Sequence, residues 1–354
     1  MTLARRTFAF TLALLPLAAV SRQAVAENLP TTIRFGDVGF GLANPFGQGL
    51  LSIADAKGFI AKEFEGTPVK LQFNYFTGTG PAINEALSNG QLDVVSYGSV
   101  PNVIGKANGL PTRLLLAYGG TNMFGGARTD LDIKSITDLK GKRVTLQKAT
   151  ILHWGLIRAL QEAGLSEKDV TIVDLKTADQ LAAIASKSVD VVFGPSFILP
   201  LKEKGLIQLF YRSKDLGPRG SGFGGILSTN AFATQYPEAT QRIVRGILRA
   251  AKFIAKEENR DEVFQIWSRN GTSAESYKQE FDGIALKEAY NPLIDDFALA
   301  RYRSVIAFNR EQKLIRNDVD LAKWIDTSFL DRGLKDTGLE KFWPKRQETG
   351  AEIN

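Results

Sequence analysis

A short pattern that occurs twice constrains the fold of this chain more than any other feature. Residues 92–95 (Leu-Asp-Val-Val) and 189–192 (Val-Asp-Val-Val) each place an aspartate in a short β-branched run, which is typical of a buried strand. Each run leads into a glycine and a proline, at residues 98–101 and 194–195, where a strand would give way to a helix. One such unit in each half predicts two similar lobes that face each other across a binding cleft.

The rest of the chain up to Tyr236 alternates between two kinds of pattern. Apolar runs that suit strands are followed by segments with helical spacing of their apolar residues. This alternation indicates an α/β protein with two lobes, each a mainly parallel sheet flanked by helices. From Tyr236 onward the spacing is mostly helical, which predicts a helical C-terminal extension that covers the first lobe.

Two glycine-rich segments, residues 119–126 and 217–225, mark where the chain is expected to cross between the lobes. Glycine tolerates a wide range of backbone angles, as a moving connection requires. Two crossings imply a hinge of two strands. We therefore expect the first lobe to consist of residues 27–119 and 225–354, and the second lobe of residues 120–224.

The first 26 residues have the pattern of a cleavable export signal. Arg5 and Arg6 precede an apolar run over residues 8–20, and residues 24–26 (Ala-Val-Ala) suit a signal-peptidase site. The apolar run is too short to span a bilayer. We therefore expect residues 1–26 to be a signal peptide and the mature protein to be soluble in the periplasm. Both the general and the twin-arginine export routes remain open.

The composition argues against several classes of function. The chain has no cysteine and a single histidine, which excludes disulfides, thiolate metal sites, a lipid-modified cysteine and a histidine-rich metal site. No Ser-His-Asp set and no paired carboxylates stand at a strand end. The net charge of +6 falls to +3 (6 − 3) without Arg5, Arg6 and Arg22, and no basic block with interleaved aromatic residues follows. We therefore expect a monomeric protein that is not an enzyme, needs no cofactor and binds no nucleic acid.

Five expected helix starts follow strands and would direct unpaired N–H groups towards the cleft. Each start also carries the positive end of a helix dipole, so that several together would bind an anionic group without a charged side chain. Four of them have proline where the first helical residue would lie, a pattern that also simply favours helix initiation. The five starts are Asn44-Pro45, Gly80-Pro81, Val100-Pro101, Thr150-Ile151 and Gly194-Pro195.

At these loops the chain resembles the periplasmic substrate-binding proteins of ABC importers, of the sulfonate, taurine and nitrate type. The resemblance implies the type II periplasmic binding protein fold. It also implies a protein that captures a small organic anion by hinge closure and delivers it to an ABC permease in the inner membrane. The resembling segments are residues 76–86, 90–95, 138–144, 147–153, 189–192 and 224–229.

The resemblance places the ligand contacts at the loops that follow the strands. Tyr97 joins these residues because an aromatic ring at a strand end can sandwich a ligand. His153 is expected either to donate a hydrogen bond to the ligand or to pack in the interior. The expected ligand-binding residues are Gly41, Leu42, Thr79, Gly80, Tyr97, Ser99, Thr150, Ile151, His153, Phe193 and Phe197.

Two loops depart from the pattern of the family and make the cleft less polar. Residues 149–152 read Ala-Thr-Ile-Leu where the family usually has glycine and several hydroxyl residues, and residues 193–197 replace a Trp-Asp-Pro segment with Phe-Gly-Pro-Ser-Phe. A ligand with an apolar or aromatic body and one anionic end fits better than a bare oxyanion. Two alternatives remain. One is a ligand sensor for a membrane kinase. The other is an enzyme on the same fold, such as one that makes the thiamin pyrimidine, although such relatives use cysteines.

Overall fold

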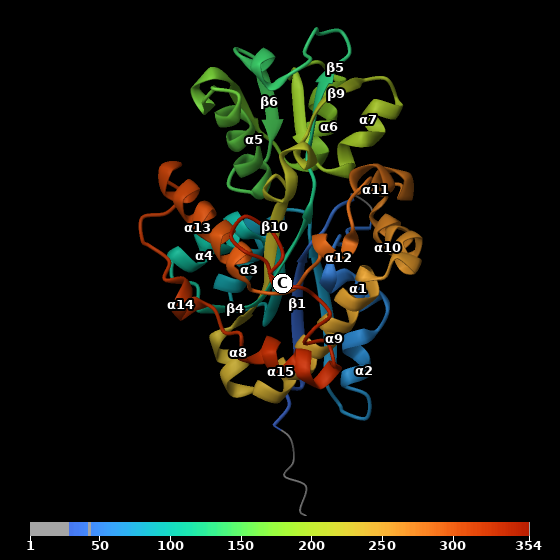
Figure 1. Cartoon of the computed structure of the whole chain (residues 1–354), viewed down its shortest axis with the longest axis vertical. Coiled ribbons are helices and arrows are strands. Elements are labelled where there is room, and N and C mark those ends of the chain that lie inside the picture. Colours follow the sequence, from blue (N-terminus) through green and yellow to red (C-terminus); the bar gives the residue numbers. More distant parts are fainter. Residues whose placement is uncertain (1–27, 42–43, 354) are drawn as a thin grey trace, which may run out of the picture.

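The computed structural model describes residues 28–41 and 44–353, and its strands form two five-stranded sheets. Figure 1 shows the first sheet in the lower half of the molecule and the second in the upper half, joined by the segments that lead from β4 to β5 and into β10. The expected signal peptide, residues 1–26, lies outside the described residues. In the part of the chain that is described, no helix is both long enough and apolar enough to cross a membrane.

The first sheet has the strand order β2-β1-β3-β10-β4. Strand β1 pairs in parallel with β2 and with the central strand β3, whereas β10 pairs antiparallel with β3 and β4. The strands are β1 (Thr32–Val38), β2 (Lys70–Phe76), β3 (Val94–Gly98), β4 (Thr112–Thr121) and β10 (Gly222–Thr229).

The second sheet repeats this arrangement in the order β7-β6-β8-β5-β9. Strand β6 pairs in parallel with β7 and β8, and β5 pairs antiparallel with β8 and β9. Each sheet is therefore mixed, and the two-lobe α/β prediction is confirmed with fewer parallel pairs than expected. The antiparallel pairs arise at β10 and β5, the strands by which the chain enters each sheet from the other one. The strands are β5 (Phe124–Arg128), β6 (Arg143–Leu146), β7 (Thr171–Asp174), β8 (Val191–Gly194) and β9 (Ile207–Arg212).

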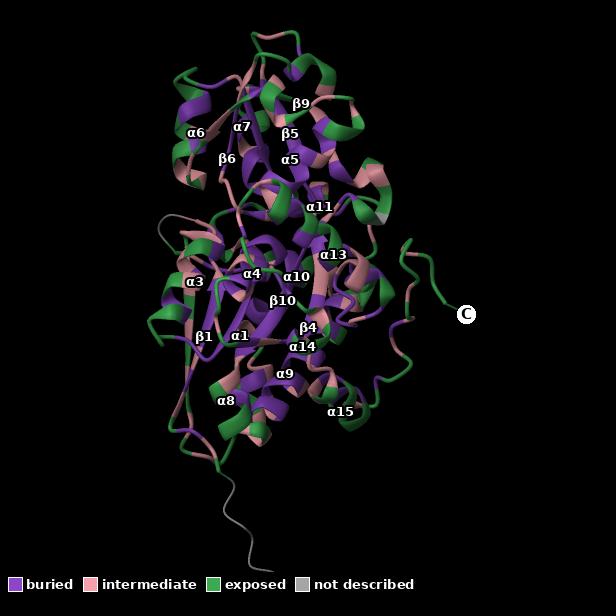
Figure 2. Cartoon of the chain, turned by 90° about the vertical axis from the view of Figure 1, so that its left-hand side faces the viewer, coloured by how far each residue is buried: buried purple, intermediate pink, exposed green. Residues whose placement is uncertain are grey.

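Helices cover both sheets and leave the central strands in the interior, as the colouring by burial in Figure 2 shows, whereas the edge strands β2 and β7 are partly exposed. The helices that follow the strands are α1 (Leu50–Ala56), α2 (Phe59–Glu63), α3 (Thr79–Ser88), α4 (Ser99–Ala107), α5 (Ile151–Glu162), α6 (Thr177–Ala185) and α7 (Leu199–Glu203). The C-terminal helices are α8 (Asn230–Gln235), α9 (Pro237–Ala255), α10 (Arg260–Trp267), α11 (Ala274–Glu280), α12 (Leu286–Ala289), α13 (Asp296–Glu311), α14 (Leu321–Trp324) and α15 (Ser328–Thr337).

The C-terminal helices pack on the first lobe, as their apolar spacing predicted, and α11 also contacts the turn Ser196–Ile198 of the second lobe. The longest of them, α9, begins at Pro237 and turns a continuous apolar face inward, where Ile243, Ile247 and Leu248 are fully buried. This face joins α1 and β1 in one hydrophobic core. Burying several such side chains, at roughly 1.5–3 kcal/mol each, is what holds the extension against the sheet.

The aspartates of the repeated pattern have the same structural role in both sheets. The Asp93 carboxylate accepts hydrogen bonds from the backbone N–H of Arg34 (2.8 Å) and from its guanidinium (2.7 and 3.0 Å). The Asp190 carboxylate accepts the equivalent bonds from the backbone N–H of Arg143 (2.8 Å) and from its guanidinium (2.8 and 3.2 Å). Each aspartate precedes one strand and each arginine lies on the parallel neighbour, so the pair sets the register between them.

All four expected proline positions at helix starts differ from the prediction, and Pro195 is the extended residue before the 3-10 turn Ser196–Ile198 and not its first helical residue. Helix α1 begins at Leu50, well after Pro45, and Pro81 and Pro101 are the third residues of α3 and α4. Proline is tolerated throughout a first helical turn because those N–H groups have no partner within the helix. The sequence pattern therefore located the turns but not the first residue of each helix.

Removing the first aspartate pair should destabilise the fold. We expect Asp93→Ala to lower the free energy of unfolding by about 2–3 kcal/mol, because Arg34 and its backbone amide lose their shared acceptor. Asp132→Ala is the matched control, because the Asp132 and Lys134 side chains of its ion pair are about four-fifths exposed. This control should change the free energy by less than about 0.5 kcal/mol. Equal urea midpoints for the two variants would contradict the register role of Asp93.

Candidate functional site

A cleft lies between the two sheets, at the ends of strands and the beginnings of helices. It holds about 800 Å³ of space that no atom fills, with its open mouth included. The cleft is lined by Asp37, Val38, Phe40, Gln48, Thr79, Gly80, Tyr97, Gly98, Pro101, Tyr118, Thr121, Gln147, Thr150, Ile151, Leu152, Thr177, Pro195, Phe197, Phe223 and Gly224.

Two helices of the cleft wall begin at its surface and supply polar backbone groups. Thr79 is the first residue of α3 and Thr150 is the N-cap of α5, where its Oγ1 accepts a hydrogen bond from the N–H of Leu152 (3.3 Å). Helix α5 has twelve residues, long enough for a substantial dipole. The free N–H groups of these first turns and the positive dipole ends favour an anionic group of a ligand.

The start of α3 depends on a residue without a side chain. A Cβ atom at Gly80 would lie 2.1 Å from Pro101 Cγ, far inside van der Waals contact. Glycine at this position therefore lets α3 and α4 begin side by side at the cleft surface. The sequence showed a glycine here, but only the packing shows why a larger residue is excluded.

Aromatic rings form the apolar part of the cleft. Phe40, from the first lobe, stacks against Phe197, from the second, with ring centroids 6.4 Å apart and an interplanar angle of 25°. Phe223 lies on the connecting strand β10, and its ring is held edge-on by Trp154 (6.1 Å) and Tyr302 (5.2 Å). Such surfaces bind the flat or apolar body of a ligand.

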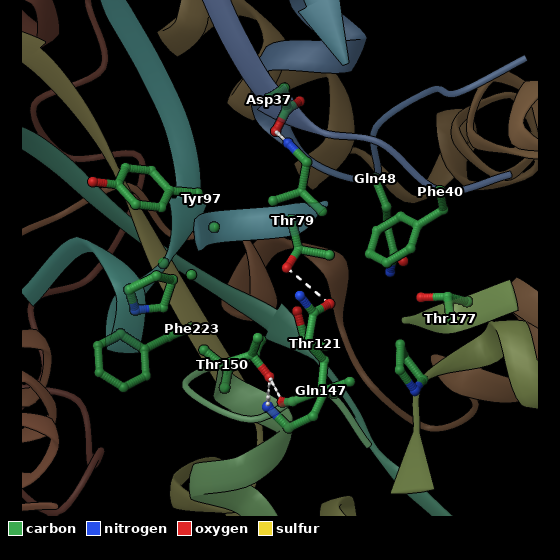
Figure 3. Close-up of a pocket in the computed structure, with 18 of the residues that line it drawn as sticks. Asp37, Phe40, Gln48, Thr79, Tyr97, Thr121, Gln147, Thr150, Thr177 and Phe223 are labelled. Carbon is green, nitrogen blue, oxygen red and sulfur yellow. Dashed lines mark hydrogen bonds between the residues drawn. The ribbon is translucent and has the colours of Figure 1, made fainter. Parts of the chain in front are cut away.

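The two sides of the cleft also touch through hydrogen bonds. Thr79 Oγ1 donates to Gln147 Oε1 (3.1 Å), and Gln147 Nε2 donates to the carbonyl oxygen of Gly78 (3.3 Å). Figure 3 shows the Thr79 and Gln147 side chains pointing towards one another across the cleft. Because Gln147 follows β6 of the second sheet and Thr79 opens a helix of the first lobe, these bonds hold the lobes close together.

A buried carboxylate, Glu280, joins three parts of the molecule beside the cleft. It lies at the end of α11 and accepts hydrogen bonds from the N–H of Asn122 (3.2 Å), the N–H of Ser196 (3.1 Å) and Gln48 Nε2 (3.2 Å). Asn122 follows β4, where the chain leaves the first sheet, and Ser196 follows β8 of the second. Burial raises the pKa of the Glu280 carboxyl to about 7, although the hydrogen bonds act in the opposite direction.

Asp37 is the only Asp, Glu, Lys, Arg or His among the lining residues that the structure describes. It ends β1 almost completely buried, and its Oδ1 accepts a hydrogen bond from the N–H of Val38 (2.9 Å). Desolvation raises the pKa of its carboxyl well above the usual value, so the neutral form is favoured. The lining therefore contributes no fixed positive charge, and an anionic ligand would rely on backbone and hydroxyl groups.

The structure brings six of the expected residues together on the cleft surface: Thr79, Gly80, Tyr97, Thr150, Ile151 and Phe197. Gly41 lines a neighbouring hollow that shares Phe40, Thr177 and Phe197 with the cleft. Leu42 lies outside the described residues. Their contact with a ligand remains a prediction.

Three expected residues lie behind the lining. Ser99 is fully buried near the start of α4, and Phe193 stacks on Tyr211 with ring centroids 5.1 Å apart. His153 is buried against Phe308, with its Nε2 3.7 Å from Glu167 Oε1, and burial lowers its pKa. In this arrangement these side chains support the wall of the cleft.

Sequence reasoning did not name several residues of the site. Gln147 lies inside residues 147–153, one of the segments that resemble the family. Because Thr150 in the same segment was expected at the cleft, Gln147 could have been predicted there as well. Asp37 is the last residue but one of β1, and its place near the end of an expected strand was a weaker signal. Glu280 has no motif around it, and only the packing of α11 against both lobes reveals its position.

Two α/β lobes with a cleft between their strand ends define a two-lobe periplasmic binding protein fold. Residues 50–260, more than half of the chain, match the NMT1/THI5-like family, and the chain belongs to this family.

Individual proteins agree with this assignment. A putative aliphatic sulfonates-binding protein of Escherichia coli (strain K12) is 29% identical over 246 residues, which cover 67% of this chain and 70% of that protein. The crystal structure of a putative periplasmic sulfonate-binding protein, SsuA from Methylobacillus flagellatus KT, superimposes with a TM-score of 0.79 at 27% identity. The superposition covers 91% of this chain and 99% of the other. The desulfurization enzyme DSZB shares the fold at 19% identity, with a TM-score of 0.65 and coverage of 86% and 99%.

The raised pKa of Glu280 predicts a pH dependence of stability. The pKa is about 7 in the folded protein and 4.5 ordinarily, so the folded state holds the proton more tightly. The resulting stabilisation is complete below about pH 4.5 and is lost as the pH rises towards 7. It should amount to about 2–3 kcal/mol.

Glu280→Gln should remove this part of the slope when the free energy of unfolding is measured by denaturant at pH 5 and pH 7. Glu275→Gln, on the exposed side of the same helix, is the matched control and should keep the slope of the wild type. An unchanged slope in Glu280→Gln would show that this carboxyl titrates normally.

Proposed function

We propose that this protein is the periplasmic solute-binding component of an ABC importer. It captures a small organic anion, sulfonate-like or with an apolar or aromatic body and one anionic end, and delivers it to a permease in the inner membrane. The observation that carries the proposal is the cleft between the lobes, which combines helix starts at Thr79 and Thr150 with the rings of Phe40, Phe197 and Phe223. Family membership and similarity to the sulfonate-binding proteins support it.

The ligand would lie with its anionic end at the first turns of α3 and α5. There it would accept hydrogen bonds from backbone N–H groups. Its body would contact the aromatic rings and the apolar side chain of Ile151. Asp37 favours its neutral form, so it would not repel the anion as an ionised carboxylate would.

Binding would act through hinge closure. The proposed lobes are residues 27–119 with 225–354, and residues 120–224, joined by the two strands that pass between the sheets. A ligand that contacts both lobes stabilises the closed arrangement by its differential affinity for that state. The Thr79–Gln147 bonds and the Glu280 contacts with Asn122 and Ser196 already join the lobes, and opening would break them.

We further propose that the protein acts as a monomer in the periplasm, without a cofactor, nucleic acid or catalytic step. The relatives named as binding proteins support this, whereas the enzyme DSZB shares only the fold with this chain. Solute capture and delivery need no reacting group in the cleft, because the solute is only bound and then released.

A thermal-shift screen of the mature chain tests the function. Alkyl and aryl sulfonates, aromatic carboxylates, pyrimidines and nitrate form the panel, and any ligand found is then examined by small-angle scattering. We expect the largest shift with an anion that has an apolar body, together with a smaller radius of gyration. A shift with nitrate alone would contradict the ligand class, and unchanged scattering with a bound ligand would contradict hinge closure.

Two substitutions test the site with the ligand that the screen identifies. Thr150→Ala and Phe197→Ala should each weaken binding by about 1–3 kcal/mol, the first through loss of the cap that orders the first turn of α5 and the second through loss of aromatic contact. Thr150→Ser and Phe197→Leu are the conservative controls and should retain most of the affinity by calorimetry. Because Thr150 also caps α5, affinity is compared at a temperature at which every variant is folded. Unchanged affinity in both alanine variants would remove these residues from the site.

A further inference from the structure

A second pocket lies beside the strands that connect the lobes, and it is separate from the cleft. It holds about 1030 Å³ of unfilled space with its open mouth included. The end of β4 contributes Gly119 and Gly120, and Ser221 precedes β10. Lys214 comes from the segment between β9 and β10, and α13 and the C-terminal segment contribute Arg301 and Arg346.

Arg301 stands out because its charge is buried without an acid. The residue is 8% exposed, its guanidinium donates to the carbonyl oxygen of Ser221, and its Nε has no hydrogen-bond partner. The guanidinium carbon lies 4.1 Å from the centre of the Phe223 ring and 5.2 Å from that of Phe297. Among residues 28–41 and 44–353, no carboxylate forms an ion pair with Arg301.

The other two cations of the pocket are already paired. Lys214 Nζ lies 3.2 Å from Asp282 Oδ2, and Arg346 Nε lies 2.8 Å from Asp295 Oδ2. Glu288 and Glu352 also line the pocket, but neither forms an ion pair with Arg301. Among the lining residues that the structure describes, Arg301 is therefore the cation without an ion-pair partner.

A buried charge without a counter-charge is energetically costly, because the guanidinium loses water and the aromatic faces replace only part of that solvation. Burial accordingly lowers the pKa of Arg301. A small anion in the pocket would remove this cost, since it would accept the unused donors of Arg301 while remaining in contact with solvent through the open mouth.

We propose that this pocket is a second binding site, which takes a small oxyanion such as sulfate, phosphate or a carboxylate. Arg301 is the principal ligand, and Lys214 is a second cation in the same lining. The occupant would contact both the C-terminal helices and the segment that leads out of the second sheet. It would thereby brace the hinge.

The two sites would be coupled through Phe223. Phe223 lines the ligand cleft, and the Arg301 guanidinium packs over the Phe223 ring. An anion that draws the guanidinium towards itself changes the packing of this ring. Any effect on ligand affinity in the cleft must be matched by an equal effect of the ligand on anion affinity.

The test uses the mature chain without cleft ligand, titrated separately with sodium sulfate, phosphate and acetate against sodium chloride at equal ionic strength. We expect a saturable rise in melting temperature and a calorimetric isotherm with at least one oxyanion. Arg301→Gln should weaken binding by more than about tenfold, and Lys214→Gln by about threefold to tenfold. If Arg301→Gln does not fold, Lys214→Gln still tests the proposal. Lys214 pairs with the exposed Asp282, so this substitution is expected to leave the fold intact.

Two controls separate this site from others. Arg303→Gln removes a neighbouring arginine of α13 that is more than half exposed and pairs with Glu348, and it should bind the oxyanion like the wild type. Thr150→Ala and Phe197→Ala should also retain oxyanion binding, since both residues line the cleft and neither lines the second pocket. No saturable binding, equal binding in Lys214→Gln and the wild type, or loss of binding in the cleft variants would overturn the proposal. It does not depend on which solute the cleft takes.

Discussion

The paired contacts between Arg34 and Asp93 and between Arg143 and Asp190 set the geometry on which the rest of the structure depends. In each sheet an aspartate holds both the backbone amide and the guanidinium of the neighbouring parallel strand. A shift by one residue would reverse every side chain on that strand, so a fixed register places the strand ends at one level. The helices that follow can then begin side by side at the cleft.

Because the strand ends lie at one level, the helices that follow them begin together at the cleft. These helix starts explain how the cleft can favour an anion while its lining carries no cation. The first turns of α3 and α5 supply N–H groups and dipole ends, and Gly80 allows the helices to approach. Aromatic rings supply the remaining surface. The lobes meet through Thr79 and Gln147 over the cleft and through Glu280 beside it. The same contacts that shape the site therefore also hold the two lobes together.

The sequence predicted the fold better than the site because the two depend on different kinds of information. The repeated pattern around Asp93 and Asp190 and the alternation of strands and helices are local, and they led directly to two lobes. Thr150 was correctly expected at a helix start because an N-cap is a local property. Pro81 and Pro101 were placed two positions early, since proline fits several positions of a first turn. The mixed sheets were not anticipated, because strand direction at a crossing depends on where the chain re-enters.

By itself the sequence determined the class of protein: the periodicity, the repeated strand-to-helix unit and the resemblance to solute-binding proteins all follow from residues close together in the chain. Only the tertiary structure decided which side chains meet. Glu280 lies 84 residues from Ser196 and 158 from Asn122, yet its carboxylate joins both. Arg301 lies 80 residues from Ser221 in the sequence, yet its guanidinium donates to the carbonyl oxygen of Ser221. Only the packing beside the connecting strands buries this arginine away from any ion-pair partner. Burial and long-range packing change the chemistry of a side chain, and neither is a property of its neighbours in the sequence.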